Sequence, residues 1–83
     1  MNIGKVFRNF REEMGITQRS LAKALGITPT ALYKIESGRN HPKLTTIDAF
    51  RGISGYCTAR IYIEALNASD YENGTSQSPT ALQ

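Results

Sequence analysis

The fold is decided by residues 18–38, which read QRSLAKALGITPTALYKIESG. In the first half of this stretch apolar residues recur at helical spacing, preceded by Thr17, a good N-cap, and ended by Gly26. Thr28 is the cap of a second helix, and Pro29 occupies its first position, where a missing N–H costs nothing. The inward-facing residues are Leu21, Ala22, Leu25, Leu32 and Ile35. Two helices this short bury too little apolar surface alone, so they must pack on flanking helices.

The same stretch follows the pattern Q-x-x-L-A-x-x-x-G-I-T-x-x-x-L-x-x-I-E-x-G. This pattern resembles that of the Cro-type (Xre, or phage-repressor-like) helix-turn-helix DNA-binding family. The matching residues are Gln18, Leu21, Ala22, Gly26, Ile27, Thr28, Leu32, Ile35, Glu36 and Gly38. The resemblance implies an all-α fold, a lambda-repressor-like bundle of four to five short helices. A bundle of merely packed helices would need neither Gln18 nor the ending Glu36-x-Gly38.

Composition limits the class of protein. The chain has 83 residues, enough for one small domain, and a formal charge of +3. Residues 1–66 hold ten Lys and Arg against five Asp and Glu, a basic balance that suits a polyanionic partner. Cys57 is the single cysteine, so no disulfide framework and no metal site is expected. We expect a cytoplasmic protein without a membrane partner, because the sequence shows neither a signal peptide nor a long apolar run.

No set of residues suggests catalysis. The segment Gly52-Ile53-Ser54-Gly55 lacks the closing glycine of a nucleophile elbow, and His41 is the single candidate base. We therefore expect no enzymatic activity and no cofactor.

An amphipathic helix is predicted at the start of the chain, with Asn2 as its cap and Gly15 as its end. Its apolar face consists of Ile3, Val6, Phe7, Phe10 and Met14. Arg11 lies where the resembled family has an arginine that pairs with a glutamate of the third helix, here Glu36. The resemblance thus implies a structural ion pair, which would fix the orientation of the third helix more than it would stabilise the fold.

A fourth helix is marked by Leu44, Ile47 and Phe50 and is expected to run to about Ile53. After it, residues 58–65 (TARIYIEA) alternate with a period of two, which favours a strand over the fifth helix usual in this family. A lone strand needs a partner, and the same segment of a second copy would provide one. The competing interpretation is a short fifth helix, which would also dimerise. The residues predicted to dimerise are Tyr56, Ile61, Ile63 and Leu66.

A strand paired across a dimer resembles the arrangement in the antitoxin subunit of Hip-type toxin–antitoxin pairs. That looser resemblance implies a toxin protein as a second partner and autoregulation of the operon. From residue 67 the composition becomes polar. We therefore predict a DNA-binding and dimerisation domain over residues 1–66 and a mobile polar tail over residues 67–83.

In the resembled family the third helix lies in the DNA major groove and the second crosses the backbone. The resemblance then implies base reading by Pro29, Thr30, Ala31, Tyr33 and Lys34. It implies phosphate contacts by Gln18, Arg19, Ser37, Arg39, Asn40 and Lys43. Lys34 can donate to guanine O6 or N7, and readout at Pro29 should be apolar or absent. The expected function is a sequence-specific double-stranded DNA-binding transcriptional regulator, a dimeric repressor of an inverted repeat. The alternative is an antitoxin that neutralises a toxin protein.

Overall fold

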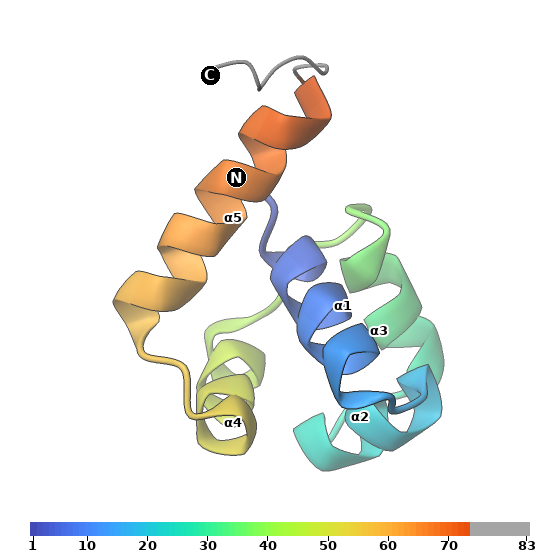
Figure 1. Cartoon of the computed structure of the whole chain (residues 1–83). Coiled ribbons are helices and arrows are strands. Elements are labelled where there is room, and N and C mark those ends of the chain that lie inside the picture. Colours follow the sequence, from blue (N-terminus) through green and yellow to red (C-terminus); the bar gives the residue numbers. More distant parts are fainter. Residues whose placement is uncertain (74–83) are drawn as a thin grey trace.

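The structure is a computed structural model that describes residues 1–73, with only the backbone described for residues 69–73. Over this range it contains five helices and no strand (Figure 1). They are α1 (Ile3–Met14), α2 (Gln18–Leu25), α3 (Pro29–Glu36), α4 (Leu44–Ser54) and α5 (Thr58–Asn73). The predicted all-α fold is therefore confirmed. None of the described helices combines the length and the apolar character needed to cross a membrane.

The helix boundaries follow the capping residues that the sequence predicted. The side-chain oxygens of Asn2, Thr17 and Thr28 each accept a backbone N–H in the first turn of α1, α2 and α3, at 3.0–3.1 Å. Gly15 and Gly26 end α1 and α2 in the left-handed conformation, with φ of 69° and 78°, which a residue with a side chain rarely adopts. Helix α4 begins without a side-chain cap.

Helix α1 is the centre of the fold, with α5 on one side and α2 and α3 on the other (Figure 1). The core beside it is aromatic: the rings of Phe7 and Phe50 stack with their centroids 4.3 Å apart. Phe10 and Tyr56 pack edge-on around Phe50, at 5.3 and 5.6 Å. Four aromatic side chains from α1, α4 and the segment before α5 thus join the three parts of the chain.

The strand predicted over residues 58–65 is wrong, and the competing prediction of a fifth helix is confirmed. The alternating pattern also places Ile61 and Ala65 four residues apart, on one face of a helix, and both are fully buried. That face packs on α1, and the N–H of Asn2 donates to the carbonyl oxygen of Ala65 at 3.0 Å. Packing on α1 therefore outweighs the strand propensity of the segment.

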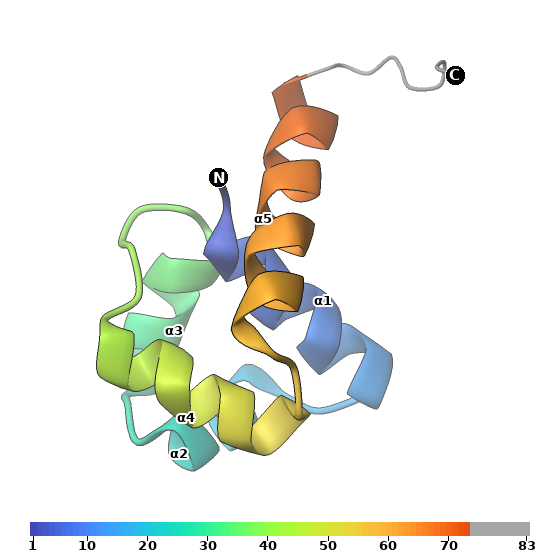
Figure 2. The same cartoon turned by 90° about the vertical axis from the view of Figure 1, so that its left-hand side faces the viewer.

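Helix α5 crosses the boundary that composition suggested between residues 66 and 67, and its last turns extend past the other helices (Figure 2). The predicted tail beyond residue 73 lies outside the described residues. Met14 is a second correction: it is 61% exposed rather than part of the core. Met14 lies on the same side of α1 as the core residues, but it is in the last turn of the helix, where no described element covers it.

Replacing Gly4 by Ala should lower the free energy of unfolding by about 1–3 kcal/mol, the usual cost of overpacking. A Cβ atom at Gly4 would lie 2.7 Å from the carbonyl carbon of Ile35 in α3, and closer still to its oxygen. Gly52 of α4 is the matched control, because a Cβ there meets no atom within 4 Å. Gly52→Ala should stabilise by about 0.5–1 kcal/mol. Urea denaturation measures both; a Gly4→Ala protein as stable as its parent would contradict the close packing of α1 on α3.

Candidate nucleic-acid interface

Helices α2 and α3 form one rigid unit. The turn between them is closed by the N–H of Gly26 on the Lys23 carbonyl (3.1 Å) and by the N–H of Ile27 on the Ala22 carbonyl (3.0 Å). The two helices pack on each other, and Leu21 of α2 and Leu32 of α3 are both fully buried. The outward side of α3 is consequently held in a fixed position relative to α2.

The outward side of α3 carries the residues predicted to read bases. Leu32, Ile35 and Glu36 are buried, and the opposite side of the helix is left to solvent. Its exposed residues are Pro29, Thr30, Tyr33 and Lys34, followed by Ser37. Ala31 is half-buried and therefore lies at the margin of this surface.

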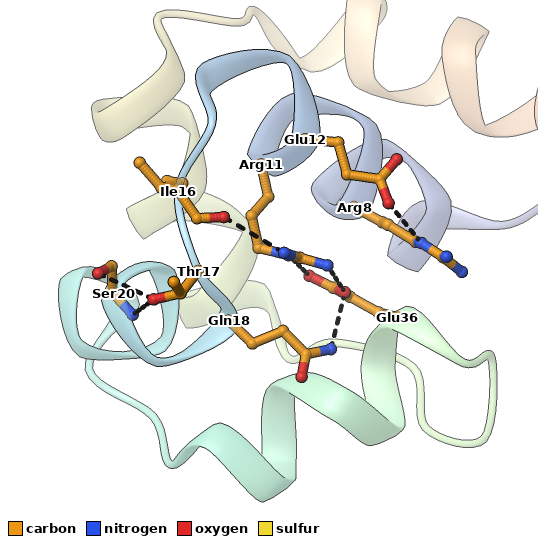
Figure 3. A network of polar contacts seen from close by, with 8 residues as sticks. All are labelled: Arg8, Arg11, Glu12, Ile16, Thr17, Gln18, Ser20 and Glu36. Atoms are coloured by element: carbon orange, nitrogen blue, oxygen red, sulfur yellow. Dashed lines mark hydrogen bonds and ion pairs between the residues drawn. The ribbon is translucent and has the colours of Figure 1, made fainter.

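A buried carboxylate holds α3 against the other helices (Figure 3). Glu36 accepts two hydrogen bonds from Arg11 of α1, from Nε to Oε2 at 2.9 Å and from Nη2 to Oε1 at 3.1 Å. The Glu36 side chain is only 3% exposed. Arg11 also donates from Nη1 to the carbonyl oxygen of Ile16 at 3.2 Å. Hydrogen bonding to Glu36 raises the pKa of the Arg11 guanidinium, although burial opposes this shift.

Gln18, the first residue of α2, is part of the same network. Its Nε2 donates to Oε1 of Glu36 at 3.0 Å, and its amide oxygen points away from that carboxylate (Figure 3). The side chain predicted to contact a phosphate is thus oriented by an internal hydrogen bond. Because the phosphate contact was assigned from the resemblance, it stays a prediction.

The other predicted phosphate residues lie in α2 and after α3. Those exposed to solvent are Arg19, Arg39, Asn40 and Lys43. The loop after α3 is ordered by the N–H groups of Arg39 and Asn40, which both donate to the carbonyl oxygen of Lys34, at 2.9 and 3.2 Å. The Arg39 guanidinium lies 6.0 Å from the centre of the Tyr33 ring, within range of a cation–π contact.

The exposed charged side chains of this region are all positive. Residues 17–43 contain five Lys and Arg, and their single carboxylate is Glu36. Because Glu36 is buried and paired with Arg11, it presents no negative charge to a ligand. The surface formed by α2, α3 and the following loop is therefore purely cationic, as a surface for a polyanion should be.

Comparison with known proteins agrees with this geometry. The helix-turn-helix family model HTH_3 matches residues 7–50, which include all of α2 and α3. The chain belongs to the Cro-type helix-turn-helix family. The crystal structure of the clp gene regulator ClgR from Corynebacterium glutamicum is similar to it, with a TM-score of 0.77 and 28% sequence identity over 87% of this chain and 77% of that chain. A search of curated proteins finds no match.

Membership of this family makes the chain a DNA-binding regulator of transcription, with α3 in the place of the recognition helix. One basic residue near this helix-turn-helix unit was not assigned from the sequence. Arg8 of α1 lines the same hollow as Tyr33 and Ser37, and its Nε pairs with Glu12 at 3.1 Å on the exposed surface. Arg8 lies three residues before Arg11, so helical spacing puts both on the same side of α1. That spacing could have indicated that Arg8 lies close to α3.

The structure separates the four residues predicted to dimerise. Tyr56 and Ile61 are buried in the core of the single chain, so their assignment to a dimer contact is wrong. Ile63 and Leu66 are exposed, at 58% and 51%. The difference arises because a helix turns by about 100° per residue, whereas a strand would have placed Ile61 and Ile63 on the same face.

Removing Arg11 should destabilise the fold strongly, because a buried carboxylate would lose its counter-charge. We expect Arg11→Met to lower the free energy of unfolding by about 3 kcal/mol. Arg8→Met is the control: Arg8 and Glu12 are half-exposed, so breaking their pair should change the stability by less than about 0.5 kcal/mol. Both are measured by urea denaturation. Equal effects of the two substitutions would show that Glu36 does not depend on Arg11.

Proposed function

We propose that this protein is a sequence-specific transcriptional repressor that binds an inverted repeat in double-stranded DNA as a homodimer, with α3 in the major groove. The observation that carries the proposal is the surface of α2, α3 and the following loop, where every exposed charge is positive and the single carboxylate is buried. The similarity to ClgR, a gene regulator by its title, supports a role in transcription.

Base reading is assigned to the exposed side of α3. The major groove admits one α-helix and presents a different donor and acceptor pattern for each base pair. Lys34 lies in the last turn of α3, is exposed to solvent, and can donate to guanine O6 or N7. The base-reading set remains Pro29, Thr30, Tyr33 and Lys34, with half-buried Ala31 at its margin.

Phosphate contacts are assigned to the residues around that surface, which position the protein without specifying a sequence. Arg19 lies at the start of α2, and Arg39 and Lys43 lie in the loop after α3. Gln18, Ser37 and Asn40 are the uncharged members of the set. Because each Lys or Arg on a phosphate releases counterions, the affinity should fall steeply as the salt concentration rises.

Dimerisation is assigned to the outer side of α5. Ala59, Ile63 and Leu66 have the spacing i, i+4, i+7 and form an exposed apolar stripe away from the face that packs on α1, and half-buried Tyr62 lies at its edge against the core. One domain makes too few base contacts to define a unique site. A two-fold dimer would read two half-sites about 10 base pairs apart, or a multiple of that spacing. It would repress by blocking the polymerase at a promoter.

The antitoxin alternative was motivated by a strand over residues 58–65 and by the polar tail, and α5 occupies residues 58–65, which removes the first of these two observations. The proposal therefore favours the repressor and includes no toxin partner. The proposal assigns no catalytic activity and no cofactor, and it places the protein in the cytoplasm, where its DNA is. Among the side chains that the structure describes, no three of His, Cys, Asp or Glu gather where they could hold a metal ion.

Replacing Lys34 by Ala should weaken binding to the operator by about 1–3 kcal/mol and relax the preference at one base pair. Arg39→Ala is the comparison: it should weaken binding to all sequences alike and reduce the slope of log K against log salt by about 1. Fluorescence anisotropy with operator and random duplexes, over a range of salt concentrations, measures both quantities. Equal affinity of the parent protein for operator and random DNA would contradict specific reading.

Replacing Ile63 by Asp should give a folded monomer, because the side chain lies on the exposed stripe of α5. Ile61→Asp should instead unfold the protein, since it would place a charge in the core. Light scattering gives the oligomeric state and circular dichroism the folding. An Ile63→Asp protein that remains dimeric would place the dimer contact elsewhere.

A further inference from the structure

The first turn of α3 has few groups that could hydrogen-bond to a base. Pro29 has no N–H, and the N–H of Ala31 donates to the Thr28 hydroxyl at 3.0 Å. The N–H of Leu32 donates to the carbonyl oxygen of Thr28 at 3.0 Å. In this turn only the N–H of Thr30 is left without a hydrogen bond to any residue that the structure describes.

The exposed side chains at this end of α3 are mostly apolar. Pro29 exposes its ring, and Thr30 lies on the exposed side of the helix, in line with Lys34 and Ser37 at the spacing i, i+4, i+7. The part of α3 that precedes Lys34 therefore presents a proline ring and a threonine methyl group together with one hydroxyl.

We infer that each operator half-site contains a thymine whose C5-methyl group packs against Thr30 and Pro29. This inference rests on the proposed function, because it assumes that α3 enters the major groove. The thymine methyl is the apolar feature among the base edges of that groove. A polar base atom placed against the Pro29 ring or the Thr30 methyl group would be desolvated by apolar surface, which costs free energy, whereas a methyl group there gains by burial.

The position of this thymine relative to the Lys34 contact follows from helix geometry. Thr30 and Lys34 are four residues apart, or about 6 Å along the axis of α3. Successive base pairs are about 3.4 Å apart. The thymine should therefore lie within about two base-pair steps of the guanine that Lys34 binds.

The test begins with selection of binding sites from random duplexes by the full-length protein. Each thymine that is enriched in the half-site is then replaced by uracil, which removes the methyl group and leaves the hydrogen-bonding edge unchanged. At one thymine we expect about fourfold weaker binding, the effect of one buried methyl group. Uracil at the other thymines should have little effect and provides the internal control.

Two substitutions at Thr30 separate the methyl group from the hydroxyl. Thr30→Val keeps the methyl group and should retain the fourfold preference for thymine over uracil. Thr30→Ser keeps the hydroxyl but lacks the methyl group, and it should lose most of the preference for thymine. Lys34→Ala should retain the methyl preference and lose the guanine preference.

The outcomes distinguish this inference from the proposed function. If selection enriches no sequence, the proposed function fails. If it enriches a sequence but uracil is tolerated at every thymine, the methyl contact is overturned while specific reading stands. A Thr30→Ser protein that still binds thymine about fourfold better than uracil would also overturn it.

Discussion

The structure depends on the burial of a single carboxylate. Glu36 is the last residue of α3, and it is held by Arg11 from α1 and by Gln18 from α2 (Figure 3). Three helices therefore meet at one side chain. Burying this charge would be costly without the two hydrogen bonds from Arg11, and such a pair contributes more to orientation than to net stability. Helix α3 has only eight residues, too few to be stable alone, so its position is imposed by its neighbours.

Most of the fold could be predicted because its signals are local. Thr17, Thr28 and Asn2 are caps that act within three residues, and the structure shows each of their hydrogen bonds. Helix α5 was mispredicted as a strand because its pattern satisfies two periodicities over a short segment. What decides between them is contact with α1, which ends more than forty residues earlier in the chain. No property of the segment itself contains that information.

In the candidate site, too, local features could be predicted from the sequence and features that depend on contacts between helices could not. The exposed side of α3 follows from helical spacing, so Thr30 and Lys34 could be assigned from the sequence. The orientation of the Gln18 amide and the location of Arg8 beside Tyr33 depend on how α1 and α2 lie against α3. The assignment of Ile61 to a dimer contact rested on the predicted strand, in which Ile61 and Ile63 share one face. In the helix they point to different sides, and Ile61 is buried in the core while Ile63 is exposed.

The close approach at Gly4 also limits how the protein can meet DNA. Where α1 crosses the end of α3, main chain lies directly on main chain, with no side chain between them to change rotamer. A sliding or tilting α3 would have to carry α1 with it, and α1 is fixed by the stacked rings of Phe7 and Phe50. The backbone of α3 is thus held in place, so that adjustment of fit falls to its exposed side chains and to the duplex. Base steps that bend or twist easily should then be favoured even where no side chain touches them.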